Sequence, residues 1–370
     1  DEAVKAQKPS ETFLSRYMKA KETSRINGPF PYQPKFSYEN FVTDFVVDPL
    51  RGFSLRLETQ MNDILENFRI YGGIQTAFDW KSGDVFGEFH YLKHRVDFSV
   101  RYDRKVIFWT PPQLNTATPV NDSRQKYSWQ KIELGVSLPL TVRLRVGVKP
   151  FGGYTFFEDL GPDQRISSPP VYQASKSQWY TGVKTELVYD NSVNVGLNIM
   201  EGTRAKVSMI HYEAIGNKNA SFSQVFLDVR HYQKIYREIV LALRGYTGTF
   251  FGNAPKQYVL GGVDNWFGNV TNYEGVKNPL YVKSGYNENL LFTEFATTLR
   301  GFDYATLYGT SVAMFNAELR LPIVQALSGG NVSSSFFRHM QFTTFYDIGT
   351  SWTGAPPIGT ENSLRTVEVK

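Results

Sequence analysis

Residues 131–138 read Lys-Ile-Glu-Leu-Gly-Val-Ser-Leu, and residues 142–149 read Val-Arg-Leu-Arg-Val-Gly-Val-Lys. In both stretches every second residue is apolar, and the residues between are charged, small or hydroxylic. Successive side chains of a β-strand point to opposite faces, so each stretch predicts a strand with one apolar and one polar face. The same period of two recurs from about residue 53 onward, for example at 95–102, 225–230 and 238–244. The sequence therefore predicts an all-β protein.

A soluble β-sandwich and a transmembrane β-barrel share this alternation, so other features must separate them. The predicted strands run for about 10–15 residues, longer than the roughly 5–6 of globular strands and long enough to cross a bilayer when tilted. Full charges stand in mid-strand on the polar face, as suits a watery lumen. Trp80, Trp109, Trp129 and Trp179 lie near predicted strand ends, where barrels place an interfacial aromatic girdle. We therefore predict a transmembrane antiparallel β-barrel, with the sandwich as the alternative.

Composition excludes several classes of protein. No stretch approaches the roughly 18 apolar residues of a membrane helix, although aromatic residues make up 15% of the chain. The absence of cysteine rules out disulfides, a thiolate nucleophile and a cysteine–zinc site. The five histidines show no ligand spacing, so we expect no metal and no cofactor. The net charge of +5 comes from lysines and arginines scattered among 35 acids, so we expect no nucleic-acid partner.

The alternation divides the chain into a linker, residues 1–52, and a barrel, residues 53–370. Within the barrel we count thirteen strands. Single-chain bacterial barrels usually have an even number of strands, and open edges are not tolerated in lipid. We therefore expect sixteen strands when the barrel is complete, with C-terminal strands missing. The predicted segments are 54–61, 67–79, 83–92, 95–109, 124–138, 141–158, 174–189, 203–214, 221–233, 236–250, 256–262, 309–324 and 335–352.

A set of charged residues follows in a fixed order near the end of the chain. Arg300 lies in a long loop within Leu-Arg-Gly-Phe, residues 299–302, and Glu318 and Asp347 lie on the next two predicted strands. Strand parity places both carboxylates on the inner face. A planar guanidinium can make paired, charge-assisted hydrogen bonds to carboxylates. We therefore predict that Arg300 is clamped between Glu318 and Asp347 inside the barrel.

This ordered pattern resembles the BamA/TamA superfamily of outer-membrane insertases and translocases. The resemblance implies an inward-folded sixth loop between strands 11 and 12, whose Arg-Gly-Phe tip docks on strands 12 and 13. It assigns the loop–barrel clamp to Arg300, Gly301, Phe302, Glu318, Asp347 and Gly349. It also matches Gly261-Gly262 to the start of the sixth loop. A fourth-loop motif before strand eight is matched by Asp190, Asn191, Gly202 and Arg204.

The resemblance implies a bacterial outer-membrane protein that assists protein insertion or translocation. Its expected partners are outer-membrane lipid and periplasmic or outer-membrane proteins. The 36 residues between Gly262 and Leu299 depart from the simplest members and resemble Bacteroidetes relatives with an N-terminal TolB-like propeller. Neither that propeller nor a POTRA domain is recognisable in this chain. Two alternatives stay open: a plugged barrel that anchors a periplasmic domain or complex, and a passive or lipid-export channel.

Structural interpretations compete with the functional ones. Arg300 either locks the loop to the wall or has a gating or substrate-coupled role. Asp190 and Arg204 stabilise their loop or bind a partner. Inner-face cations, among them Arg101 and Lys149, either form an anion-selective stripe or are balanced by acids. An arginine beside Glu318 and Asp347 would keep both ionised, which is unsuited to a proton-donating glycosidase acid. We therefore expect no enzyme.

Overall fold

The computed structural model describes residues 12–23, 32–48, 50–78, 80–109, 123–162, 174–196, 199–236, 238–269, 288–296, 298–324 and 333–356. The chain divides into two units, residues 1–35 and 36–370. The first contains α1 (Phe13–Thr23). Among the described helices, none is long and apolar enough to cross a membrane.

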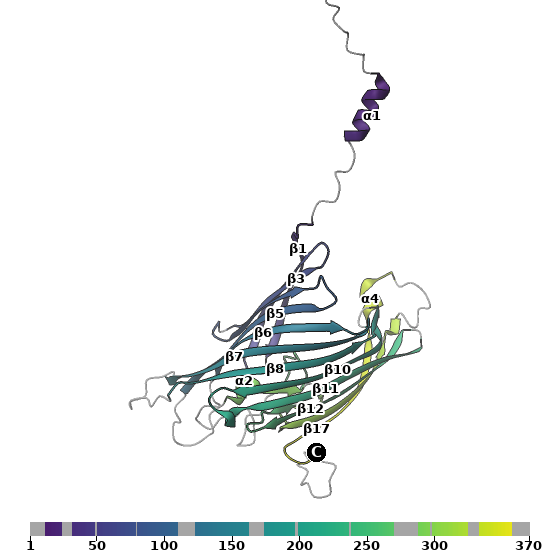
Figure 1. Ribbon diagram of the computed structural model, residues 1–370. Helices are drawn as coiled ribbons and strands as arrows, with labels where there is room; N and C mark the ends of the chain where they lie inside the picture. The colour runs from purple at the N-terminus through teal and green to yellow at the C-terminus, as the bar shows by residue number, and fades with distance from the viewer. Residues whose placement is uncertain are drawn as a thin grey trace, which may run out of the picture. The chain divides into compact units, whose positions relative to one another are not determined.

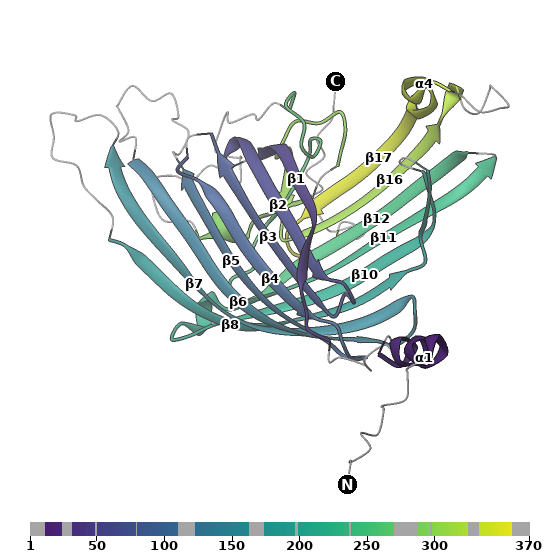
Figure 2. The ribbon, with the colours of Figure 1, turned by 90° about the horizontal axis from the view of Figure 1, so that it is seen from above.

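The second unit is a large antiparallel sheet whose strands follow one another in chain order (Figure 1). Seen from above, the sheet curves around an interior that holds described parts of the segment between β12 and β16, residues 288–296 among them (Figure 2). This confirms the predicted all-β, antiparallel barrel architecture. Within the described residues, β1 and β17 are the two edges of the sheet and do not pair with each other. The wall strands are β1 (Phe36–Asp48), β2 (Gly52–Asp63), β3 (Phe68–Ala77), β4 (Gly83–Tyr91), β5 (Asp97–Trp109), β6 (Ser123–Pro139), β7 (Leu144–Pro162), β8 (Lys176–Asp190), β10 (Ile199–Ala214), β11 (Phe222–Tyr236), β12 (Ile239–Gly252), β16 (Ser311–Leu321) and β17 (Phe342–Trp352).

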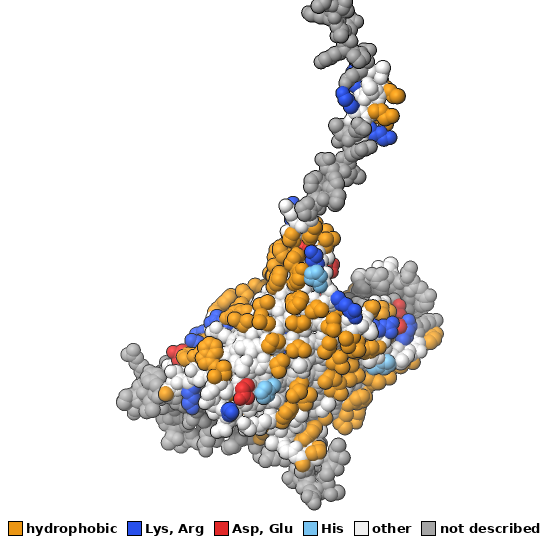
Figure 3. Space-filling model, in the orientation of Figure 1, with side chains coloured by type: hydrophobic (Ala, Val, Ile, Leu, Met, Phe, Trp, Pro, Cys, Tyr) orange, Lys and Arg blue, Asp and Glu red, His pale blue; other side chains and the backbone are white. Residues whose placement is uncertain are grey.

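The predicted alternation separates the two faces of this wall. Six apolar residues of β5 and β6 point outward and are between 39% and 55% exposed, whereas Glu133, on the opposite face of β6, is 5% exposed. Hydrophobic side chains cover much of the outer face of the sheet (Figure 3). An apolar outer face and a charged inner face are the arrangement of a membrane barrel, the reverse of a soluble sandwich. The outward residues of these two strands are Phe98, Val100, Tyr102, Ile132, Leu134 and Val136.

The wall begins seventeen residues earlier than the boundary placed at residue 53, because β1 lies inside the predicted linker. Its outward residues change parity along the strand: Phe36 and Tyr38 are exposed, and then Phe41 and Phe45. A β-bulge between Tyr38 and Asn40 inserts an extra residue and causes this change. The bulge broke the period of two and so concealed the strand.

The segment 256–262, predicted as a wall strand, is instead part of the interior. Its strand β13 (Tyr258–Leu260) pairs with β14 (Glu294–Ala296) and β15 (Leu307–Gly309) in a separate three-stranded sheet. Three consecutive apolar residues, each at most 1% exposed, mark a strand buried on both faces. The missed strand and the extra strand offset each other. The long loop therefore still falls between the eleventh and twelfth wall strands.

The core of the molecule lies between this loop and the inner wall. The helix α2 (Asn289–Phe292) places three buried apolar residues against the aromatic side chains of the wall. Trp129 packs edge-on against Phe292, with ring centroids 5.4 Å apart. The expectation of an interfacial girdle is therefore wrong for Trp129 and Trp109, which are 8% and 6% exposed. Both share strand parity with inward charged residues, such as Lys131 beside Trp129.

Candidate functional site

The long loop, residues 253–310, enters the interior through a pair of glycines. Gly261 has φ +133° and Gly262 has φ +83°, conformations that other residues rarely adopt. A Cβ at Gly261 would lie 2.3 Å from the carbonyl oxygen of Asp303. Beyond them, Leu299 N–H donates to the Gly262 carbonyl at 3.0 Å. The two glycines therefore let the start and the end of the loop lie side by side.

Arg300 sits at this junction and binds both predicted acids. Its Nε donates to Asp347 Oδ2 at 2.6 Å and its Nη2 to Asp347 Oδ1 at 2.7 Å. Its Nη1 donates to Glu318 Oε1 at 2.7 Å, and its backbone N–H adds a bond to Asp347 at 3.1 Å. The Asp347 side chain is 2% exposed. The structure thus brings Arg300, Glu318 and Asp347 together as a loop–barrel clamp.

Further side chains, which sequence reasoning missed, complete the clamp. Asn316 Nδ2 donates to the loop carbonyl of Thr298 at 2.8 Å and to Asp347 Oδ1 at 2.7 Å. The guanidinium of Arg300 lies 3.7 Å from the ring centroid of Phe345, a cation–π contact. Arg320 donates to the second oxygen of Glu318 at 2.9 Å. The signal was available, because all three share inward parity with Glu318 or Asp347.

The other predicted clamp residues have conformational or packing roles. Gly301 has φ +87° and open space around its missing Cβ, so backbone conformation favours glycine here. Phe302 is half-buried against the interior core. At Gly349, a Cβ would lie 3.0 Å from Leu260 and 3.5 Å from Leu299. Gly349 therefore leaves room for the loop to lie against β17.

Electrostatics favour a charged, locked clamp. The hydrogen bonds to Asp347, followed by those to Glu318, raise the pKa of Arg300 above its ordinary value, although burial opposes this. One cation thus faces two acids, and Arg320 supplies a second cation to Glu318. Such an arrangement holds a segment in place, and it offers neither a free nucleophile nor a proton donor.

A second anchor fixes the far part of the loop. Glu288 accepts hydrogen bonds from the wall residues Tyr180, at 2.8 Å, and Thr155, at 3.1 Å. Its other oxygen lies 3.5 Å from Nζ of Lys256, which contacts the rings of Phe222 and Phe292. Burial lowers the pKa of Lys256, and Glu288 partly counteracts that shift. The 36-residue insertion therefore packs into the interior at residues 288–296, whereas its residues 270–287 lie outside the described part.

The predicted fourth-loop residues close a different hairpin. Arg204 Nε lies 2.9 Å from Asp190 Oδ2, and Thr203 N–H donates to Asn191 Oδ1 at 2.6 Å. Gly202 has φ +107°, and a Cβ there would lie 2.7 Å from the Asn191 carbonyl oxygen. With β1 counted, this hairpin joins the eighth and ninth wall strands. Antiparallel alternation puts it at the opposite end from the sixth loop, so the predicted fourth-loop position is wrong.

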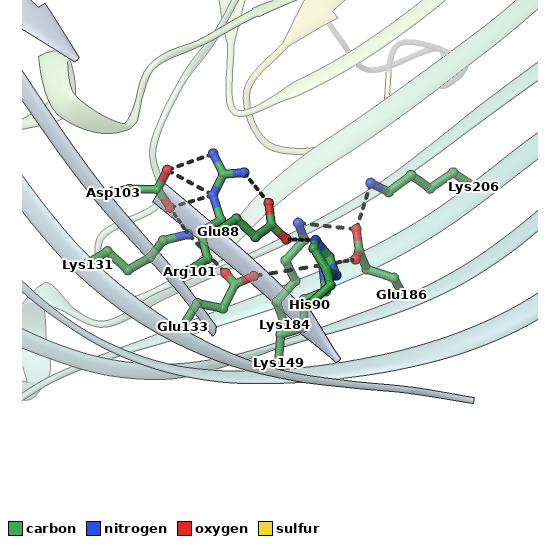
Figure 4. Close-up of polar contacts among 10 residues, drawn as sticks. All are labelled: Glu88, His90, Arg101, Asp103, Lys131, Glu133, Lys149, Lys184, Glu186 and Lys206. Carbon is green, nitrogen blue, oxygen red and sulfur yellow. Dashed lines mark hydrogen bonds and ion pairs between the residues drawn. The ribbon is translucent and has the colours of Figure 1, made fainter. Parts of the chain in front are cut away.

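Charged side chains form a continuous ion-pair chain along the inner wall from β4 to β10 (Figure 4). Glu88 lies 2.8 Å from Arg101, and Lys149 lies 3.2 Å from Glu186. Glu186 is also within 3.2 Å of Lys184 and 2.6 Å of Lys206. The predicted stripe cations Arg101 and Lys149 are thus balanced by acids. The full chain is Glu88, His90, Arg101, Asp103, Lys131, Glu133, Lys149, Lys184, Glu186 and Lys206.

Comparison with known proteins identifies similar folds. No family model and no curated protein sequence matches the chain. BamA from Haemophilus ducreyi, lacking POTRA domains 1–3, is similar with a TM-score of 0.56 and 11% identity, over 92% of this chain and 66% of that chain. CdiB from Escherichia coli has a TM-score of 0.47 and 11% identity, over 80% of this chain and 49% of that one. CdiB from Acinetobacter baumannii has a TM-score of 0.47 and 12% identity, over 87% and 50%. The likeness to BamA concerns the fold.

Proposed function

We propose that this chain is a bacterial outer-membrane β-barrel that assists the insertion or translocation of proteins. The observation that carries the proposal is the clamp, in which an inward loop is bound through Arg300 to Glu318 and Asp347. The apolar outer face and the BamA-like fold support a membrane location. Outer-membrane lipid and other outer-membrane or periplasmic proteins are the proposed partners. We also propose that this chain is related to the Bacteroidetes subgroup that carries an N-terminal propeller, because of the insertion after Gly262.

The physical means would be edge pairing. An unpaired strand edge exposes N–H and C=O groups that can accept an added strand. In the described sheet, β1 provides such an edge. A substrate with alternating apolar residues would pair there while the clamped loop keeps the neighbouring wall rigid. The proposed function needs no catalytic step.

Depletion of the protein tests this function. We expect other outer-membrane barrel proteins to fall in abundance, and complementation with the wild-type chain to restore them. The Lys184→Ala variant, altered in the redundant ion-pair chain, serves as a matched control and should also restore them. Unchanged barrel-protein levels after depletion would exclude an insertion role.

A plugged scaffold is the second candidate, and the packed interior favours it over an open pore. Residues 288–296 fill part of the interior with buried apolar side chains. Conductance across planar bilayers separates these functions. A closed or briefly opening barrel agrees with a plug, whereas a large steady pore would exclude both the plug and the scaffold.

A further inference from the structure

The loop that carries the clamp also reaches the opposite edge of the sheet. Its residue Asn265 accepts a hydrogen bond from Val47 N–H on β1, with Oδ1 2.8 Å from the nitrogen. Its Nδ2 donates to the Phe45 carbonyl at 3.4 Å. One side-chain amide thus binds a backbone donor and a backbone acceptor two residues apart on the same strand.

These two backbone groups lie on the edge of β1 that faces away from β2. Val47 is directly opposite Phe53 on β2, and the Phe53 carbonyl accepts a bond from Phe78, on the far side. Residues opposite each other in an antiparallel pair either exchange both bonds or neither, so Val47 directs its N–H outward. Phe45, two residues before, has the same orientation. Asn265 therefore occupies groups that a neighbouring strand would use.

The backbone at Asn265 suits this task. Its φ is +51°, in the left-handed region that asparagine tolerates better than most residues. Glycine would adopt the same conformation but would lack the amide. The conformation and the amide together direct a hydrogen-bonding side chain at the strand edge.

The contact is connected to the clamp through a short, bonded path. Arg300 follows Leu299, which pairs with Gly262. Val263, which follows Gly262, donates its N–H to Asn269 Oδ1 at 2.9 Å. Its carbonyl accepts hydrogen bonds from Asn269 Nδ2 at 2.6 Å and from the Tyr304 hydroxyl at 2.9 Å. Two residues further on is Asn265. One loop thus binds β17 at one end and β1 at the other, the two edges of the described sheet.

We propose that Asn265 is an edge cap. It occupies the pairing groups of β1 near Val47, is held in place by the Arg300 clamp, and must leave before another strand can pair there. The consequence for strand addition rests on the proposed function. The cap itself does not, because it is a property of the loop and β1 alone.

Hydrogen exchange at Val47 tests the cap, with the full chain in phosphatidylethanolamine–phosphatidylglycerol nanodiscs. Asn265→Gly keeps the φ angle and removes the amide, so exchange should accelerate about fivefold, as the loss of about 1 kcal/mol of hydrogen bonding predicts. Asn265→Asp keeps the acceptor for Val47 N–H and should accelerate exchange less. Arg300→Ala should also accelerate it. Asn253→Ala, which removes another exposed asparagine bound to a backbone carbonyl at 2.9 Å, should leave Val47 unchanged. Equal exchange at Val47 in wild type and Asn265→Gly would overturn the cap.

Strand addition is measured separately, as insertion of an urea-unfolded outer-membrane barrel protein into liposomes that contain each variant. The substrate should insert severalfold faster into liposomes that contain the Asn265→Gly variant than into liposomes that contain the wild type. Insertion by wild type that does not accelerate in Asn265→Gly would overturn the cap as a restraint on pairing. No insertion by either protein, together with faster exchange in the variant, would overturn the proposed function and leave the cap supported.

Discussion

The clamp on β16 and β17 and the ion-pair chain on β4 to β10 are both built from charged side chains on the inner face, but they differ in redundancy. In the clamp, Asp347 receives one guanidinium and one amide, and it is almost completely buried. In the ion-pair chain, Glu186 lies near three lysines from three strands. Both kinds of site can hold a wall together. Only the first depends on a single residue that comes from outside the wall.

The largest effect should therefore follow from Arg300→Ala. The substitution leaves a buried Asp347 without its cation and should lower stability by about 3 kcal/mol. Thermal unfolding and the temperature at which the folded band is lost on unheated gels measure the change. Arg320→Ala is the control, because Arg320 also binds Glu318 but belongs to the wall, so its effect should be smaller. An unaltered transition in Arg300→Ala would remove the clamp from the account of stability.

A somewhat smaller effect is expected at Gly248, where the loop packs on the wall without charge. A Cβ at this position would lie 2.3 Å from the hydroxyl of Tyr258, so Gly248→Val should displace the loop and cost about 1–3 kcal/mol. Gly245→Val, on the same strand with open space, is the matched control. Thermal unfolding of the pair should separate them. If both behave alike, close packing of the loop on β12 is not required.

Redundancy predicts a weaker response in the ion-pair chain. Lys206→Ala leaves Glu186 with Lys149 and Lys184 and should cost less than about 1 kcal/mol. Glu186→Ala removes the acid that all three lysines share and should cost more. Chemical unfolding curves of the two variants measure the difference. A larger loss in Lys206→Ala than in Glu186→Ala would reverse the order that redundancy requires.

The smallest effect is expected for Arg204→Ala in the hairpin between β8 and β10. Both partners of this ion pair are more than a third exposed, and such pairs contribute about 0–1 kcal/mol. Gly202→Ala should cost more, because the φ of +107° disfavours a side chain. The same unfolding curves apply. A large loss of stability in Arg204→Ala would show that this ion pair contributes more to stability than an exposed pair should.

The sequence predicted what strict alternation controls. The parity of Glu318 and Asp347 placed both on the inner face, and the planar shape of arginine made Arg300 their partner. The prediction failed where a bulge interrupts the alternation and where an unbroken run of apolar residues replaces it. The bulge near Tyr38 concealed β1, and the apolar run of β13 resembled a wall strand. Because β1 was missed, the hairpin of Asp190 was counted one strand too early and assigned to the wrong end, whereas the extra strand at β13 restored the total only beyond it.

Contacts that depend on the path of the long loop could not be predicted from the sequence. Asn265 reaches β1 across 218 positions of sequence, and no local pattern marks it. Phe345 was placed inward by parity, yet its stacking on Arg300 depends on how deeply the loop enters. Such contacts are set by the path of the loop backbone, which the two glycines permit but do not specify.

The interior segment of the loop, residues 288–296, has a consequence for the order of folding. Its anchors connect distant parts of the chain: Tyr180 and Thr155 with Glu288, separated by 108 and 133 positions, and Lys105 with the Leu291 carbonyl, separated by 186. Contacts between distant residues form slowly, because loop closure costs entropy before any bond is gained. Neighbouring wall strands are joined mainly by short turns and assemble locally. The interior segment should therefore fold last, and it should pack against wall strands that have already formed.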